Sequence, residues 1–174
     1  MASDGTQELR HRIVATPIGD VTMVAGERGL THVFFPNGDP LAEGVRSREA
    51  VHDPFLTAAA RQLEEYFDGT RERFDLDLDL RPDETSSFER EAWLVLRTIP
   101  YGETISYATQ AERIGRSGAF RAVGAANGRN PLPIVLPCHR VVGADGSLVG
   151  FGSGLPLKRA LLDLESGVQQ LPLG

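Results

Sequence analysis

The first 35 residues contain three runs in which apolar and polar side chains alternate. These runs cover residues 12–16, 21–25 and 30–35. The segments between them, PIGD and GERG, contain the small and turn-forming residues that tight turns need. Because a period of two is typical of a strand with one buried face, the pattern predicts three antiparallel strands.

A helix and a fourth alternating run follow in the first half. Apolar side chains recur at helical spacing over residues 54–67, with a proline at the start and an Asp-Gly pair directly after the end. Residues 74–80, FDLDLDL, alternate strictly and predict a half-exposed strand. We expect the polar segments 36–51 and 81–85 to be a loop and a linker. This half shows no candidate chemistry.

The second half has a helical pattern. Helices are predicted over residues 86–97, 107–114 and 119–126, and a fourth amphipathic helix begins at Pro156. Ser106 is a capping residue for the second helix, and a glycine-containing segment separates the second helix from the third. Two short helices joined in this way are typical of a helix-turn-helix unit, although many such pairs only pack against each other.

The composition fits one domain or two small ones. The 174 residues are 41% apolar and 24% charged. With the element pattern, this predicts an α+β fold with an N-terminal domain over 1–81 and a C-terminal domain over 82–174. No stretch approaches the ~20 apolar residues of a membrane span. The first ten residues lack an apolar signal core, so we expect a cytoplasmic protein that does not contact membranes.

The cysteine count narrows the chemistry. One cysteine excludes a disulfide within the chain and any zinc site built from several cysteines. The four histidines, at positions 11, 32, 52 and 139, have no paired spacing, so we expect no metal site.

Charge is distributed unevenly along the chain. The net charge of −6, taken over the whole chain, argues against nucleic acid as a partner. Residues 1–85, however, hold nine basic and 17 acidic side chains, whereas residues 86–174 hold nine basic and seven acidic ones. Residues 113–144 contain five arginines, at 113, 116, 121, 129 and 140, and no carboxylate. This arginine window predicts an anion-binding surface, the alternative being a solvated basic face.

The single thiol ends an apolar stretch, where a strand would bring it to the rim of a site. A lone cysteine is most often a buried apolar side chain. Cys138, however, is followed by His139 and Arg140, and cations beside a thiol lower its pKa. The Gly-rich loop at 150–154 lacks the lysine of a phosphate-binding loop. A reactive thiolate is therefore a hypothesis. On a strand, however, His139 would point away from Cys138, and a water could bridge the two side chains.

Several motifs of the second half occur together in one known family. They are PYGETISY at 100–107, RAVGAAN at 121–127, NP at 130–131, PCHRVV at 137–142 and LLDLE at 161–165. In order and spacing they resemble the methylated-DNA–protein-cysteine methyltransferases, also called O6-alkylguanine-DNA alkyltransferases, and the resemblance extends over nearly the whole chain. It implies a ribonuclease H-like N-terminal domain without that enzyme's carboxylate site. It also implies a winged-helix-like C-terminal domain that contains the helix-turn-helix.

The resemblance implies DNA repair by direct reversal. In this family a cysteine thiolate takes the alkyl group from guanine O6, and in some members from thymine O4, so each molecule acts once and needs no cofactor. Cys138 corresponds to the acceptor and His139 to the residue that removes the thiol proton through a water. Glu165 corresponds to the carboxylate that orients this histidine. Without the family, Glu165 would be interpreted as a solvated carboxylate at a helix end.

Other positions correspond to residues that handle the damaged base. Tyr107 corresponds to the phenol that hydrogen-bonds the extruded base, and Asn130 to the residue that braces the helix-turn-helix against the active-site loop. Arg121 corresponds to the side chain that enters the stack where the base leaves. Extrusion is needed because the O6 substituent lies inside the duplex.

The resemblance places the second helix of the unit in the minor groove, where small residues allow close approach. The residues expected to contact DNA there are Ala119, Phe120, Ala122 and Gly124, with Arg116 and Arg129 on phosphates. Those expected to line the base pocket are Pro133, Val141, Phe151 and Gly152. The expected partner is double-stranded DNA with alkylated bases, bound by a monomer, with cooperative binding along the DNA left open.

Three features depart from the family's pattern. Phe151 stands where a tyrosine is common, and it keeps a stacking face without the hydroxyl. Phe120 stands where a small residue is frequent, so it would wedge into or perturb the minor-groove contact. The chain also lacks the N-terminal cysteines that bind zinc in some relatives, so no metal is carried over.

The residues, taken without the resemblance, leave two other functions open. An alkyltransferase-like protein that only flags damaged DNA would lack the acceptor cysteine, which is present here. A Cys–His hydrolase with an acyl-thioester intermediate would turn over repeatedly, and no oxyanion-hole feature of the sequence favours it.

Overall fold

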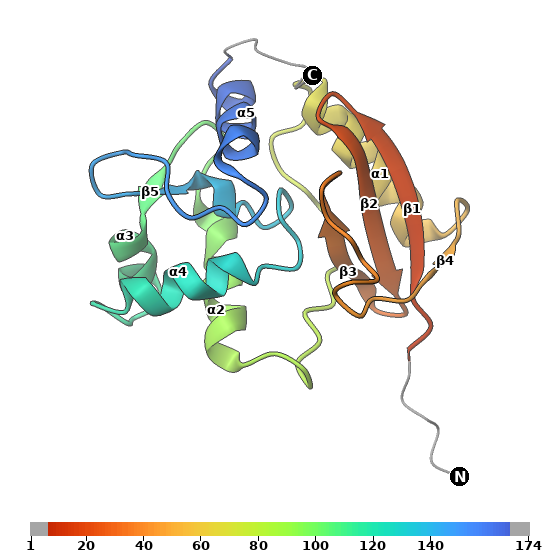
Figure 1. Cartoon of the computed structure of the whole chain (residues 1–174), viewed down its shortest axis with the longest axis horizontal. Coiled ribbons are helices and arrows are strands. Elements are labelled where there is room, and N and C mark those ends of the chain that lie inside the picture. The colour runs from red at the N-terminus through yellow and green to blue at the C-terminus, as the bar shows by residue number, and fades with distance from the viewer. Residues whose placement is uncertain (1–6, 168–174) are drawn as a thin grey trace.

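Residues 7–167 are described by the structure, a computed structural model, and they begin with a four-stranded sheet (Figure 1). The strands are β1 (Arg10–Thr16), β2 (Gly19–Gly26), β3 (Gly29–Phe34) and β4 (Arg48–Glu49). They lie in the order β3-β2-β1-β4, and β2 is antiparallel to both β1 and β3, as the alternation predicted. The two-residue β4, which pairs parallel with β1, lies in a segment expected to be a loop.

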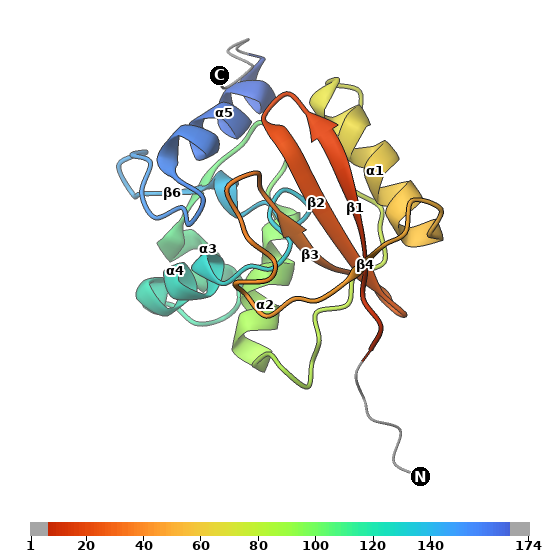
Figure 2. The same ribbon diagram turned by 45° about the vertical axis from the view of Figure 1, so that its right-hand side comes forward.

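One face of the sheet is covered by α1 (Pro54–Phe67), whose bounds are those predicted (Figure 2). The Asp53 side chain caps the first turn by accepting a hydrogen bond from the Leu56 N–H at 3.1 Å. The buried face of the helix extends to Tyr66 in its last turn, and this side chain is completely buried. The helix thereby holds a phenol at the boundary with the second half.

The strand predicted over residues 74–80 is wrong in its extent. A single bridge joins Leu78 to Leu30 of β3, whose N–H and C=O bond to the backbone on either side of Leu78 at 2.9 and 2.8 Å. At the start of the predicted strand, the Gln62 side chain makes hydrogen bonds with both the N–H and the C=O of Asp75, at 2.8 and 2.9 Å. A side chain of α1 thus replaces a neighbouring strand, and periodicity along the chain cannot reveal such a partner.

The second half consists of short helices and a two-stranded sheet. Its elements are α2 (Ser87–Val95), the 3-10 turn η1 (Leu96–Thr98), β5 (Ile105–Ser106), α3 (Tyr107–Arg113), α4 (Phe120–Gly128), the 3-10 turn η2 (Cys138–Arg140), β6 (Val141–Val142) and α5 (Leu155–Ser166). The strands β5 and β6 pair in parallel. The predicted helix-turn-helix consists of α3 and α4, and Ser106 caps α3 through the Thr109 N–H at 3.1 Å. Gly115 and Gly118 between the two helices have φ angles of 72° and 87°, which glycine adopts freely.

The segment that leads to the thiol is not a strand. Residues 132–136 form bends and a turn, Pro137 has no regular structure, and Cys138 begins η2, directly before β6. The expectation that a strand carries Cys138 and places His139 on its opposite face is therefore wrong. Prolines at 131, 133 and 137 explain the difference, because proline has no N–H to donate to a ladder.

One apolar core extends across both halves of the chain. Leu63 of α1, Trp93 of α2 and Cys138 belong to the same buried cluster. The edge of the sheet is also closed from the second half, because the Val33 N–H donates to the Pro131 carbonyl oxygen at 2.8 Å. The α+β fold predicted from the sequence is present, whereas the domain boundary stays a prediction. No helix among residues 7–167 is long and apolar enough to cross a membrane.

Candidate active site

One amide side chain makes two hydrogen bonds to the backbone of the loop between α4 and η2. Asn130 Nδ2 donates to the Leu136 carbonyl oxygen at 2.8 Å, and Asn130 Oδ1 accepts from the Leu132 N–H at 2.9 Å. Within the loop, Ile134 has a φ angle of 73°, a conformation that a β-branched residue rarely adopts. Asn130 therefore adds to the backbone hydrogen bonds of this strained loop, such as that from the Leu136 N–H to the Leu132 carbonyl oxygen at 2.8 Å, and the loop ends at Cys138.

His139 is completely buried, and its Nε2 lies 2.5 Å from Glu165 Oε2 on α5. Burial lowers the pKa of His139 below the ordinary value, although Glu165 acts in the opposite direction. The neutral ring therefore donates its Nε2–H to the carboxylate, which leaves Nδ1 unprotonated. This Nδ1 is buried and has no hydrogen-bond partner within residues 7–167. A ring in this state can accept a proton at Nδ1.

Glu165 is a buried carboxylate and not the solvated side chain that its place near a helix end suggests. Oε2 accepts from His139 Nε2, from the Tyr66 hydroxyl at 2.6 Å and from Arg140 Nη2 at 3.3 Å. Oε1 accepts from Arg140 Nε at 2.7 Å and from the Gly102 N–H at 3.5 Å. Burial acts to raise the pKa of Glu165, but the hydrogen bonds and charges of His139 and Arg140 lower it to about 2. The carboxylate is therefore ionised, with both oxygens held.

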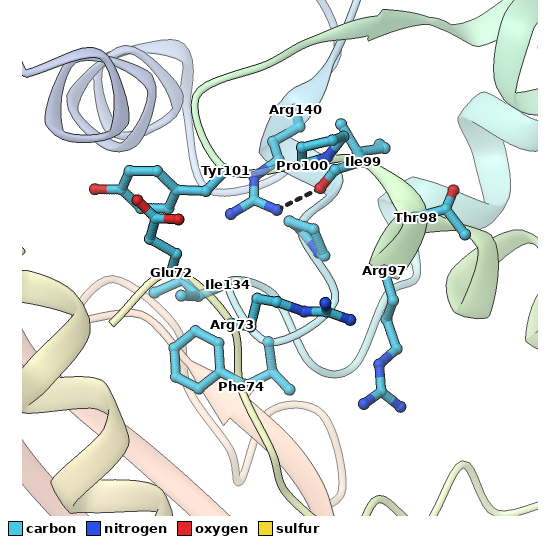
Figure 3. Close-up of a pocket in the computed structure, with 12 residues that line it drawn as sticks. Glu72, Arg73, Phe74, Arg97, Thr98, Ile99, Pro100, Tyr101, Ile134 and Arg140 are labelled. Carbon is cyan, nitrogen blue, oxygen red and sulfur yellow. Dashed lines mark hydrogen bonds between the residues drawn. The ribbon is translucent and has the colours of Figure 1, made fainter. Parts of the chain in front are cut away.

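Arg140 is the one member of the arginine window that the structure removes from the surface. Its guanidinium is buried, Nη1 donates to the Ile99 carbonyl oxygen at 2.7 Å, and the group lies 5.8 Å from the centre of the Tyr101 ring. Figure 3 shows both side chains at the edge of a cavity of about 330 Å³. The expectation that Arg140 belongs to an anion-binding surface is wrong, because its charge is paired with Glu165.

The thiol of Cys138 is only 7% exposed, and burial raises its pKa above the ordinary value. The nearby Asn130 amide and Lys158 ammonium act in the opposite direction without reversing this shift. The expectation that His139 and Arg140, which follow Cys138 in sequence, leave the thiol with a lowered pKa is therefore wrong. The structure therefore has a neutral thiol at Cys138, followed in sequence by a neutral imidazole, and a thiolate would form only if the thiol proton were removed.

Lys158, on the buried face of α5, joins β6 to the segment that follows it. Its Nζ donates to the Val141 carbonyl oxygen at 2.6 Å and to the Val149 carbonyl oxygen at 2.9 Å, and burial lowers its pKa. The ammonium lies 5.9 Å from the centre of each of two aromatic rings, those of Tyr107 and Phe151. Sequence reasoning missed this lysine, although it interrupts the apolar stripe of a predicted helix.

The residues expected to form the base pocket lie around this lysine and the loop before the thiol. The Tyr107 hydroxyl donates to the Val149 carbonyl oxygen at 3.0 Å, and burial raises the pKa of Tyr107. The others are half-buried Pro133, buried Val141, half-buried Phe151 and exposed Gly152. No group of three or more His, Cys, Asp or Glu side chains in the described part of the chain is placed to hold a metal ion.

The residues expected to contact DNA lie on or beside α4. Arg121 is exposed, and its guanidinium lies 5.9 Å from the centre of the Phe120 ring, which is also exposed. The neighbouring small residues are Ala119, which is the N-cap of α4, and the exposed Ala122. Gly124 differs from them, because a Cβ atom there would lie 3.7 Å from the Tyr107 ring. This glycine therefore faces α3 and the Tyr107 ring.

The arginine window has no carboxylate in sequence, but it has carboxylates close by in space. Arg129 Nε donates to Glu89 Oε2 at 2.8 Å, and Arg116 Nη2 lies 3.8 Å from Glu91 Oε2. The hydrogen bond from Arg129 lowers the pKa of Glu89. Both glutamates belong to α2, which precedes the window along the chain, so a count within the window could not find them.

Two family models match the chain over most of its length. The model described as "6-O-methylguanine DNA methyltransferase, ribonuclease-like domain" matches residues 9–80, and the model described as "6-O-methylguanine DNA methyltransferase, DNA binding domain" matches residues 87–167. The chain belongs to the 6-O-methylguanine DNA methyltransferase family. The family expected from the motifs of the second half is thereby confirmed, together with the ribonuclease-like first half.

Individual members of the family match nearly the whole chain. The methylated-DNA–protein-cysteine methyltransferase of Methanosarcina barkeri is 45% identical over 157 residues, which are 90% of this chain and 97% of that protein. The protein of the same name from Mycobacterium leprae is 52% identical over 154 residues, 88% of this chain and 90% of that one. The crystal structure of Mycobacterium tuberculosis OGT in complex with DNA has a TM-score of 0.80 and 42% identity, covering 91% of this chain and 94% of that chain.

Within this family fold, the site contains more residues than the motifs indicated. The structure places His139 against Glu165 and Asn130 close to Cys138, whereas the catalytic roles that the resemblance implies for these four residues stay predictions. It adds Arg140, Lys158 and Tyr66. For Tyr66 the sequence offered no signal, because this residue lies on the apolar face of a helix in the half without candidate chemistry.

Proposed function

We propose that this chain repairs duplex DNA by moving the alkyl group of O6-alkylguanine to the sulfur of Cys138, once per molecule and without a cofactor. The observation that carries the proposal is the arrangement around His139. Its Nε2–H is committed to a buried carboxylate, while its Nδ1 is buried without a partner in the described chain, next in sequence to the single thiol. A nucleophile, a base and a group that orients the base are what an activated cysteine requires.

The reaction balances with the groups present and one water. A water between Cys138 Sγ and His139 Nδ1 passes the thiol proton to the imidazole. The sulfur attacks the alkyl carbon, so that a carbon–sulfur bond forms while the bond from that carbon to guanine O6 breaks. The electron pair stays on the guanine, which takes a proton from Tyr107 or from solvent, and the proton gained by His139 afterwards returns to Tyr107 or to solvent, so that both side chains are neutral again. Glu165 stabilises the imidazolium that results, and the thioether is the final state of the protein.

The raised pKa of the Cys138 thiol limits when the reaction can occur. Because burial favours the neutral thiol, little thiolate exists before a base enters the pocket. The inserted base supplies the electrophile at the moment when the relay removes the proton. We propose that Phe151 stacks on this base, and that Pro133, Val141 and Gly152 complete the pocket.

DNA contact falls to α4 and the arginines beside it. We propose that Ala119, Phe120 and Ala122 lie in the minor groove, that Gly124 gives the base room beside Tyr107, and that Arg121 fills the space in the stack when the base leaves. DNA phosphates would then replace the glutamates of α2 as partners of Arg116 and Arg129, independently of the DNA sequence. We extend the proposal to O4-alkylthymine as a second substrate, and to a cytoplasmic monomer that associates with the nucleoid when bound to DNA.

A labelled duplex tests the function directly. The chain is incubated with duplex DNA that carries O6-methylguanine labelled in the methyl group, and the label is counted on the protein and in solution. We expect about one label per wild-type molecule and none on the Cys138→Ala variant, which should still bind the duplex. Tight binding without transfer would favour a damage-flagging protein. Repeated release of labelled small product would favour a hydrolase and exclude the proposal.

A further inference from the structure

A residue from the first half of the chain lies inside the catalytic hydrogen-bond network. Tyr66, in the last turn of α1, donates its hydroxyl hydrogen to Glu165 Oε2 at 2.6 Å, across 99 positions of sequence. The same oxygen accepts from His139 Nε2 at 2.5 Å. Both Tyr66 and His139 are completely buried. The phenol, the carboxylate and the imidazole therefore form one chain of hydrogen bonds that ends at Nδ1.

The phenol is fixed in place by aromatic rings on several sides. The Tyr66 ring lies edge-on to Phe67 and Tyr101, with ring centres 5.2 and 6.2 Å away, and tilted against Phe74 at 5.5 Å. Such packing locks the rotamer, so the hydroxyl has no second position to occupy. Burial, and then the charge of Glu165, raise the pKa of Tyr66 well above its ordinary value. The group is thus a permanent neutral donor at neutral pH.

We propose that Tyr66 is a positioning residue of the alkyl transfer, whose hydroxyl fixes Glu165 so that the carboxylate holds His139 with Nδ1 available to the thiol of Cys138. The inference rests on the proposed function. It makes the ribonuclease-like half, in which the sequence shows no chemistry, a part of the active site. Alkyl transfer would then depend on the hydrogen bond between Tyr66 of α1 and Glu165 of α5 as well as on the PCHR segment.

The chemical effect of this hydroxyl on the base has a definite direction. Oε1 is held mainly by Arg140 Nε, whereas Oε2 accepts short hydrogen bonds from the imidazole and the phenol and a longer one from Arg140 Nη2. A donor on Oε2 withdraws negative charge from the side that faces His139. Without it the carboxylate would stabilise the imidazolium more strongly, and the pKa of His139 would rise. The base would then be protonated, and inactive, up to a higher pH.

The test compares two tyrosine variants that lose the same atom. Tyr66→Phe removes the donor to Glu165, while Tyr101→Phe removes a hydroxyl that makes no hydrogen bond within residues 7–167, from a ring packed against the same site. The rate of transfer to Cys138 is measured with free O6-benzylguanine over a range of pH, so that DNA binding does not enter. For Tyr66→Phe we expect a rate lower by about tenfold, the lower end of what removing an orienting partner costs. The acid limb of the pH profile should move to higher pH, and Tyr101→Phe should change neither quantity.

A double variant separates positioning from packing. If Tyr66 acts through the carboxylate, adding Tyr66→Phe to Glu165→Gln should slow the reaction no further than Glu165→Gln alone. An unchanged rate and pH profile in Tyr66→Phe, with transfer intact in the wild type, would overturn the inference. Absence of transfer in the wild type would instead overturn the proposed function.

A second replacement covers the case in which Tyr66→Phe does not fold. Replacing Tyr66 by 3,5-difluorotyrosine keeps the ring and the hydroxyl but makes the phenol a stronger donor. The acid limb should then move to lower pH, opposite in sign to the shift expected for phenylalanine. An acid limb that stays in place would count against the role of Tyr66.

Discussion

Two groups of arginine–glutamate pairs in this molecule have similar chemistry and opposite surroundings. Arg140 and Glu165 lie 2.7 Å apart with side chains that are 7% and 1% exposed. Arg129 and Glu89 lie 2.8 Å apart, but their side chains are 59% and 18% exposed. In the pair of Arg116 with Glu91 of α2, about half of each side chain is exposed. The distance between the charged atoms does not distinguish the Arg140–Glu165 pair from the Arg129–Glu89 pair. The exposure of the side chains to water does.

The difference indicates how reaction and recognition are divided in the fold. A buried pair is costly to break, because removing one partner leaves a charge without solvent. An exposed pair contributes little to stability and exchanges readily for another anion. The site around Glu165 is therefore assembled before any ligand arrives. The surface along α4 is held by weak contacts that a phosphate backbone can replace.

The largest expected effect is on the buried group. Glu165→Ala leaves the Arg140 guanidinium buried without its carboxylate, and it should lower the free energy of unfolding by about 3–5 kcal/mol. Glu91→Ala, which breaks the exposed pair with Arg116, should lower it by less than about 1 kcal/mol. Urea unfolding followed by circular dichroism measures both values. Comparable losses in the two variants would contradict the distinction between a fixed site and an exchangeable surface.

The sequence predicted this division only in part. Its periodicity indicates helices and strands, but not which arginine pairs with which glutamate in the folded chain. The three long strands, α1 and the helix-turn-helix were predicted from periodicity and turn residues, which act locally. The strand over 74–80 failed because a glutamine side chain of α1 satisfies part of its backbone. Arg140 was predicted as a surface arginine because its partner, Glu165, lies 25 positions away and reaches it only through the packing of α5.

The active site shows the same limit. The residues that family motifs carry, Cys138, His139 and Glu165, were predicted by number. The state of the thiol was predicted with the wrong sign, because adjacent cations in sequence were counted and burial was not. Tyr66 had no local signal at all, since a tyrosine on the apolar face of a helix is typical of core packing. Contacts across 99 positions become visible only when the two halves are packed together.

The second expected effect concerns an arginine that belongs to neither group. Arg121 forms no ion pair with a described residue, and its nearest aromatic neighbour is Phe120. If it fills the stack during base extrusion, Arg121→Ala should slow repair of duplex O6-methylguanine by on the order of tenfold or more, since unstacking costs a few kcal/mol. Transfer from free O6-benzylguanine should stay near the wild-type rate, because the relay around Glu165 is untouched.

A charge-matched control accompanies this variant. Arg61→Ala removes one positive charge from α1, where Arg61 is exposed and 3.5 Å from Glu65, and it should leave both rates unchanged. Equal slowing of the duplex and free-base reactions by Arg121→Ala would place Arg121 in the chemistry and refute a role in extrusion.

The smallest expected effect is a gain in DNA affinity, and it concerns the carboxylates that pair with the arginines proposed to bind phosphates. Glu89→Gln keeps the side chain that completes the capping box with Ser86 at the start of α2, because glutamine also accepts that hydrogen bond. It removes the charge that holds Arg129. Affinity for undamaged duplex should rise a few-fold at low salt, and it should depend more steeply on salt because one more arginine is free to displace counterions.

Glu112→Gln makes the same charge change on α3, where Glu112 pairs with no described arginine. If both variants strengthen binding equally, long-range charge accounts for the gain and the Arg129–Glu89 pair has no part in recognition. If only Glu89→Gln does, the exposed pair lowers DNA affinity until a phosphate replaces the carboxylate, which the buried pair at Glu165 cannot do.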